Sequence, residues 1–132
     1  MADAADIHGT AHKNGSVTLL ARVVGSDAQN IVRADVSSAK YTVYLLDDQD
    51  ADGRTAITGH TDVSLTVAEL IFNDLQTDAP WAADDTGYNF RHVLDVSGNQ
   101  AFQVAGRRYL IEFQLTPTSG QVILVRFRLN VI

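Results

Sequence analysis

Two stretches near the end of the chain decide the fold: residues 107–115 read RRYLIEFQL and residues 121–132 read QVILVRFRLNVI. Apolar side chains occupy every second position in both, as at Ile111 and Phe113 in the first and at Val125 in the second. A period of two is typical of a strand with one face on a core and the other toward solvent or a partner. A short TPTSG segment joins the two stretches, so together they predict a β-hairpin.

Shorter strand-like segments precede this hairpin. Their ranges are 16–24, 40–46, 57–58, 62–65 and 88–94. The segment at 40–46 is apolar on both faces and is expected to lie inside a sheet, and the one at 88–94 turns His92 toward the core. About six to eight short strands predict a mainly β protein, an antiparallel β-sandwich of immunoglobulin-like type, although the chain lacks the cysteines of a true immunoglobulin domain.

One short helix is expected at about residues 67–75. Thr66 and Glu69 fit the capping-box pattern at a helix start, and apolar residues follow at helical spacing. A competing interpretation assigns residues 65–67 to a strand. Fourteen of the sixteen acidic residues are aspartate, a turn former, and only two are glutamate, which argues against further helices.

Length, charge and cysteine content limit the class of protein. A chain of 132 residues is expected to be one domain, with residues 1–15 as a flexible arm and residues 16–132 as the sandwich. A net charge of −6 disfavours nucleic acid as a partner, and the absence of cysteine excludes thiol catalysis and disulfides. Because neither a signal peptide nor an apolar run of about 20 residues is visible, the protein is expected to be made in the cytoplasm and not to contact a membrane.

The loop at 48–53, DQDADG, is the sharpest candidate site. Asp48, Asp50 and Asp52 alternate and are followed by a glycine, like the first half of an EF-hand calcium loop. The second half departs from that pattern, because its twelfth position is Gly59 where a glutamate is needed. The loop is therefore either a candidate Ca²⁺ site or a solvated acidic turn between strands, and no other cofactor is expected.

No catalytic set is recognisable. The chain has no Gly-x-Ser-x-Gly elbow and no glycine-rich phosphate loop, so we expect that it is not an enzyme. Trp81 and Tyr88 could provide an aromatic ligand platform beside Asp84 and Asp85, in company with a calcium loop.

Arginines gather in the last third of the chain. Arg126 and Arg128 share one face of the final strand, and Arg91 is expected near them across the sheet. This cationic face either remains solvated and prevents edge pairing or forms a charge-complementary protein interface. Self-association, in which acidic loops of one copy meet the arginine face of the next, would produce rings or tubes.

The segment at 105–116, AGRRYLIEFQLT, followed by GQVI at 120–123, resembles a hairpin that recurs in tailed-phage proteins. The resemblance extends loosely over residues 16–132, and the acidic loop at 48–53 departs from it. It implies an immunoglobulin-like module of a tail, baseplate or head accessory protein, and it brings over no catalytic residue.

The sequence thus predicts a non-enzymatic structural or assembly protein of a phage or phage-like particle, as a head decoration, connector or tail module. Its partners would be identical copies or other virion proteins. The expected interface residues are Ile7, His8, Arg91, Arg126 and Arg128. The alternative is a calcium-dependent binding or adhesion module built on the loop at 48–53.

Overall fold

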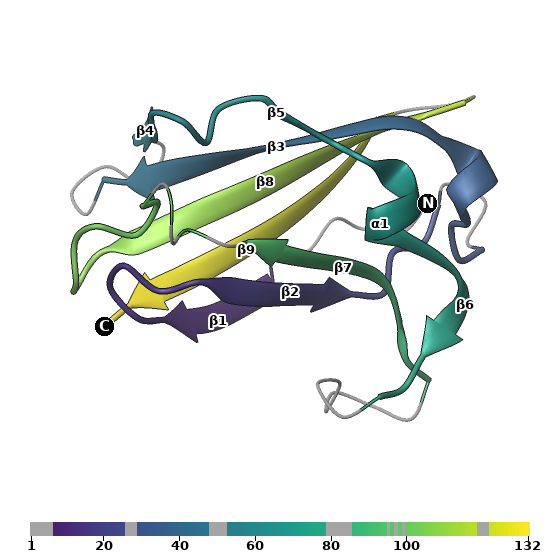
Figure 1. The fold of residues 1–132 in the computed structure, drawn as a ribbon, viewed down its shortest axis with the longest axis horizontal. Coiled ribbons are helices and arrows are strands. Elements are labelled where there is room, and N and C mark those ends of the chain that lie inside the picture. The colour runs from purple at the N-terminus through teal and green to yellow at the C-terminus, as the bar shows by residue number, and fades with distance from the viewer. Residues whose placement is uncertain are drawn as a thin grey trace.

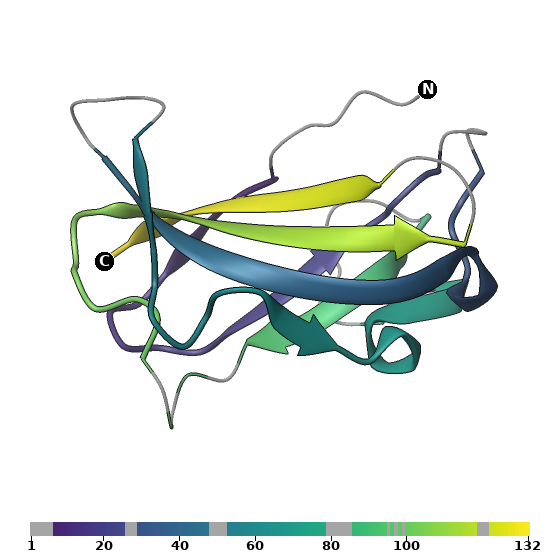
Figure 2. The same cartoon turned by 90° about the horizontal axis from the view of Figure 1, so that it is seen from above.

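The computed structural model describes residues 7–25, 29–47, 53–78, 86–94, 96, 98, 100–118 and 122–132, which form two packed β-sheets (Figures 1 and 2). In chain order, the elements are β1 (Ile7–Ala11), β2 (Val17–Ala21), the 3-10 helix η1 (Arg33–Asp35), β3 (Val36–Leu46), β4 (Arg54–Ala56), β5 (Val63–Leu65), α1 (Val67–Leu70), β6 (Ile71–Gln76), β7 (Tyr88–Leu94), β8 (Arg108–Pro117) and β9 (Ile123–Val131). Neither helix in this part of the chain is long and apolar enough to cross a membrane.

The sheet topology is that of an immunoglobulin-like sandwich. One sheet, which we call the front sheet, has the order β1-β9-β8-β3-β4, with β5 also paired to β3. The other, which we call the back sheet, has the order β2-β7-β6 and lies nearer the viewer in Figure 1. In an immunoglobulin domain, strands G, F and C are neighbours in one sheet and strands B, E and D in the other. Here β9, β8 and β3 take the places of G, F and C, and β2, β7 and β6 take those of B, E and D. Only β1 pairs in parallel, with β9, among the described strand pairs. The predicted fold class is confirmed.

The hairpin that decides the fold also supplies the centre of the core. Its inward-facing residues line the core, and Ile111 and Phe113 among them are completely buried. The Phe113 ring meets Phe90 of the back sheet edge to face at 4.9 Å between centroids, and Phe127 at 5.8 Å. Edge-to-face pairs at these distances add to the hydrophobic stabilisation that burial itself provides, so the aromatic cluster joins the two layers.

The connection that crosses from β7 to β8 ends in a tyrosine corner. The ring of Tyr109, at the start of β8, is buried, and its hydroxyl oxygen accepts a hydrogen bond from the Val104 amide at 3.1 Å. Phe102 packs edge to face on the same ring. This arrangement is a hallmark of immunoglobulin-like domains, where it fixes the start of the F strand.

The predicted helix begins at the expected residue but ends early. It spans Val67–Leu70, and residues 71–75 of the predicted helix belong instead to strand β6. Thr66 is the N-cap residue, yet its side chain makes no cap hydrogen bond. An isolated nine-residue helix is marginal because nucleation is costly, so pairing of Ile71 opposite Phe90 of β7 outweighs the local helical preference.

Part of the segment predicted to be a flexible arm belongs to the front sheet. Residues 7–11 form β1, which runs parallel to β9 in register from Ile7–Phe127 to Ala11–Val131. The sheet therefore includes residues that lie before the predicted domain start at Ser16. Residues 1–6 lie outside the described residues.

Candidate functional site

The predicted calcium loop cannot be compared with the structure. Asp48, Asp50 and Asp52 lie outside the described residues, as does Trp81 of the predicted ligand platform. Within the described ranges, no group of three or more histidine or acidic side chains is arranged to hold a metal ion.

Tyr88 does not provide an aromatic platform. It is only 1% exposed, and the Phe72 ring packs edge to face against it at 5.7 Å. Its hydroxyl donates a 2.6 Å hydrogen bond to Oδ1 of Asp78. Burial, followed by this acidic neighbour, raises the pKa of Tyr88 above its ordinary value of 10.0. The predicted role of Tyr88 in a ligand platform was wrong, because its side chain belongs to the core-facing register of β7.

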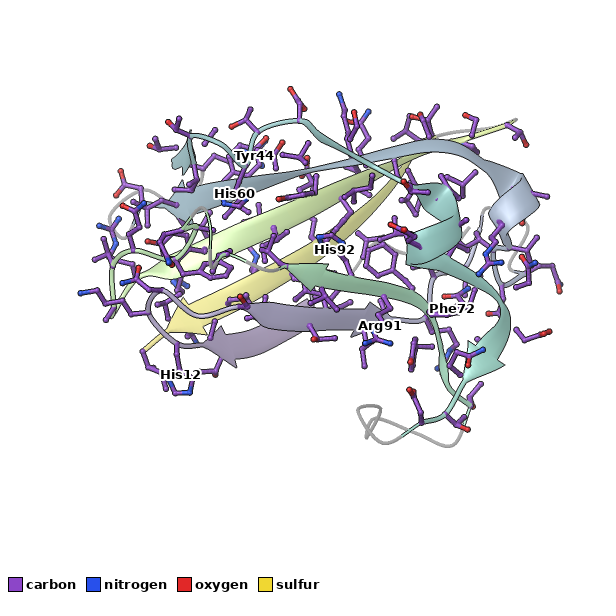
Figure 3. All side chains as sticks on the ribbon, viewed as in Figure 1. His12, Tyr44, His60, Phe72, Arg91 and His92 are labelled. Atoms are coloured by element: carbon purple, nitrogen blue, oxygen red, sulfur yellow. The ribbon has the colours of Figure 1, made fainter. Side chains whose placement is uncertain are left out.

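Arg91 was predicted to lie near Arg126 and Arg128, and this was wrong. It belongs to β7 of the back sheet, where it lies opposite Leu20 of β2. Arg126 and Arg128 belong to β9 of the front sheet. Figure 3 shows Arg91 beside β2, on the back-sheet layer. Sequence alternation assigns a residue to one face of a strand, but it does not say which sheet the strand joins.

The structure does bring together three of the predicted interface residues. We call the outer surface of the front sheet the front face. Arg126 and Arg128 alternate with the buried Val125 and Phe127, so they point outward to this face. His8 of β1 lies directly beside Arg128. Ile7 precedes His8, so its side chain points to the opposite face of β1. It lies opposite Phe127 at the sheet edge and is 37% exposed.

Sequence reasoning missed a charged cluster at the centre of the front face. Nε of Arg126 donates a 2.9 Å hydrogen bond to Oε2 of Glu112, directly across the β8–β9 ladder. Nη1 of Arg54 in β4 lies 3.8 Å from the same carboxylate oxygen, and its guanidinium carbon sits 4.3 Å above the Tyr44 ring. We call these four residues the Arg54–Arg126 cluster. The alternation of 123–131 indicated the face of Arg126, but only strand pairing brings Arg54 to it.

The front face is cationic on an acidic protein. Its basic residues, placed by alternation and register, are Lys40, Arg54, Arg108, Arg126 and Arg128. Glu112 forms ion pairs with both Arg54 and Arg126, and Asp62 forms an ion pair with Lys40 at 3.4 Å. Because the whole chain carries a net charge of −6, the remainder of the molecule is strongly acidic.

Two histidines flank one buried tyrosine between the sheets. His60, 4% exposed, ends a turn in the connection between β4 and β5, where its amide donates to the Ile57 carbonyl at 3.0 Å, and its Nδ1 is hydrogen-bonded to the Tyr41 hydroxyl at 2.9 Å. His92 of the back sheet approaches the same ring at 5.4 Å between centroids (Figure 3). Burial lowers the pKa of His92 and raises that of Tyr41. The core-facing position predicted for His92 is confirmed, whereas the inward turn of His60 gave no sequence signal.

Val43 keeps both of its main-chain bonds at this turn. Its carbonyl accepts from the Ile57 amide, and its amide donates to the His60 carbonyl, each at 2.8 Å. The turn therefore places a polar side chain in the core without leaving these main-chain groups unsatisfied. The histidine pair is part of the packing between layers and does not reach the front face.

Comparisons of the chain with family models, with curated proteins and with solved structures give no match.

Proposed function

We propose that this chain is a non-enzymatic structural subunit of a phage or phage-like particle, and that it assembles through its front face. The cationic front face on a chain of net charge −6 is the observation that carries the proposal. The phage context rests on the resemblance of the segment at 105–116 to the hairpins of tailed-phage proteins. The immunoglobulin-like sandwich suits such a role, because its rigid sheet presents a fixed surface.

The side chains of the front face are of the kinds that interfaces favour. Arginine and tyrosine are enriched in protein interfaces and dominate their hot spots. Arg126 is already held by Glu112, and Arg54 rests on Tyr44, so binding a partner would cost these side chains less rotamer entropy. Leu124, 37% exposed, adds an apolar side chain at the start of β9 on the same face.

Charge complementarity selects a second copy of the chain as the partner. Ten of the sixteen acidic side chains fall within residues 47–85, where Arg54 is the only basic residue. This acidic part of one copy complements the cationic front face of its neighbour, in a contact of two different surfaces that continues into rings or tubes.

The test is a charge reversal at Arg128, matched by the same reversal on the other sheet. Exposed ion pairs contribute only about 0.2–1 kcal/mol to stability, so neither variant should unfold, and circular dichroism checks this. Arg128→Glu should weaken self-association about tenfold in the dissociation constant, equivalent to about 1.4 kcal/mol. Arg91→Glu, which changes the net charge equally on the back sheet, should leave the constant close to that of the wild type.

Sedimentation equilibrium measures both constants. If both variants weakened self-association equally, the change in net charge alone would explain the effect, and the front face would be refuted as the interface. A wild-type protein that stays monomeric would refute self-assembly altogether.

A further inference from the structure

Strand β1 is held to the fold by its backbone and by little else. Of its five residues only Ala11 is buried, and the other four are exposed. Among the described strands, β9 alone pairs with β1, and none pairs with the opposite edge of β1 (Figure 1). Parallel pairing is slightly weaker per residue than antiparallel pairing.

Such a strand is close to balance between bound and released states. Main-chain hydrogen bonds favour pairing, but ordering each residue costs backbone entropy of similar size, and almost no apolar burial is added. The core strand β8, by contrast, buries the side chains of Tyr109, Leu110, Ile111, Phe113 and Leu115. Local opening is therefore expected to begin at β1 long before the core unfolds.

Release of β1 would leave the edge of β9 unpaired. That edge is an open row of amides and carbonyls over five positions, from Phe127 to Val131. An open row of this kind binds another strand readily. Residues 7–11 of another copy fit this edge, because they can make the same contacts with residues 127–131 that β1 makes within one copy.

We propose that β1 is exchanged between copies when the front face has brought them together, so that residues 7–11 of one copy pair with β9 of the next. This inference rests on the proposed function only for the encounter between copies. The contact itself is made by main-chain groups and needs no charge.

The connection after β1 contains a natural hinge. Asn14 has a left-handed backbone, with φ of 60°, and Gly15 follows it. The turn is closed by a bond from the Gly15 amide to the His12 carbonyl at 2.9 Å. Straightening this turn returns Asn14 to an ordinary backbone conformation, which offsets part of the loss of this bond and of the 2.8 Å bond from the Asn14 amide to the Phe102 carbonyl.

The complete lack of cysteine makes the exchange directly testable. Thr10 and Asn130 are register partners on exposed positions of β1 and β9, at a spacing that a disulfide can bridge. The double variant Thr10→Cys/Asn130→Cys would be oxidised over a range of concentrations and separated on a non-reducing gel. Exchange predicts disulfide-linked dimers and larger species whose share rises with concentration.

The matched control is Thr18→Cys/Val93→Cys, an exposed register pair of the β2–β7 ladder in the back sheet that cannot be exchanged in the same way. It should give only internally bridged monomers at every concentration. If Thr10→Cys/Asn130→Cys also gives only such monomers while light scattering shows association, the exchange is refuted and the front-face proposal stands. If the protein is monomeric by light scattering, both proposals fail.

Hydrogen exchange of the wild type provides a second reading that needs no variant. Amides of residues 7–11 should lose protection in dilute solution before those of β8 do, and they should regain it as copies associate. Protection of residues 7–11 equal to that of β8 in dilute solution would contradict the proposal.

Discussion

At Gly87 the chain turns into β7 with φ of +106°, a left-handed conformation that side-chain-bearing residues rarely adopt. A β-carbon placed there would lie 2.5 Å from the main-chain oxygen of Gln76, which cannot move aside without disturbing β6. Gly106 also has positive φ, +84°, but nothing lies within 4 Å of the position of its β-carbon.

These two glycines form a matched pair for a stability measurement. Gly87→Ala should lower the free energy of unfolding by about 3 kcal/mol, because strain and overlap add, and Gly106→Ala by about 1 kcal/mol from strain alone. Urea unfolding followed by circular dichroism measures both values. Equal losses would mean that the close approach to Gln76 has no energetic effect.

His92 makes the stability of the sandwich depend on pH. Burial against Tyr41 and Phe113 lowers the pKa of His92 from its ordinary value of 6.5. The unfolded chain therefore takes up a proton near pH 6.5, while the folded chain does so only at lower pH. The free energy of unfolding consequently falls as the pH drops below about 6.5, until the lowered pKa is passed.

His92→Gln removes this titration. The wild type should be the more stable protein at pH 7 because its ring packs against two aromatic rings, and its advantage should be smaller at pH 5. Acidic side chains are common to both proteins, so their contribution largely cancels in the difference. Urea unfolding at the two pH values tests this, and an advantage that stays constant would show that burial does not perturb His92.

At the scale of elements, Asn89 ties the segment after β2 to the back sheet. It is 1% exposed, its Oδ1 accepts from the Val23 amide at 2.7 Å, and its Nδ2 donates to the carbonyls of Val23 and Ile31. The Asn89 side chain thus satisfies main-chain groups of Val23 and Ile31, which lie beyond the end of β2 and belong to none of the described strands.

Asn89→Ala leaves a buried amide and two carbonyls without this partner, so it should lower the free energy of unfolding by about 2–3 kcal/mol. It should also speed hydrogen exchange at Val23 and Ile31 more than at residues of β8. Loss of stability without a local change in exchange would mean that the segment is held by other contacts.

Periodicity located the strands whose one face is buried. The boundaries of the strand at 88–94 and the alternation of the final hairpin were predicted from sequence, because each apolar side chain there has a core position to fill. Residues 71–75 are predicted to be helical because the apolar residues Leu70, Ile71 and Leu75 fit both the helical and the strand period over so short a run. Pairing with β7, a contact distant in sequence, decides that segment.

The same reason explains which parts of the site were predictable. Arg126, Arg128 and their shared face follow from one strand alone. The meeting of Arg54 with Glu112 and the separation of Arg91 from them depend on which strands are neighbours, and alternation carries no such information.

At the scale of the whole molecule, charge is distributed unevenly over a rigid frame. Residues 47–85 hold ten of the sixteen acidic side chains and one basic residue, Arg54, whereas the front face gathers five basic side chains. Opposite charges at this density steer copies toward one another, and salt screens the attraction, with a Debye length of about 10 Å at 0.1 M ionic strength. Association through the front face should therefore weaken as salt is added.

The central claim is that copies associate through complementary charge, and light scattering after size exclusion tests it most directly. The wild-type protein would be measured over a hundredfold range of concentration, at low and at high ionic strength. The account predicts a mass that rises above that of the 14.3 kDa monomer with concentration and returns toward it in high salt. A mass that stays at 14.3 kDa under every condition, or association that salt does not weaken, would contradict the account.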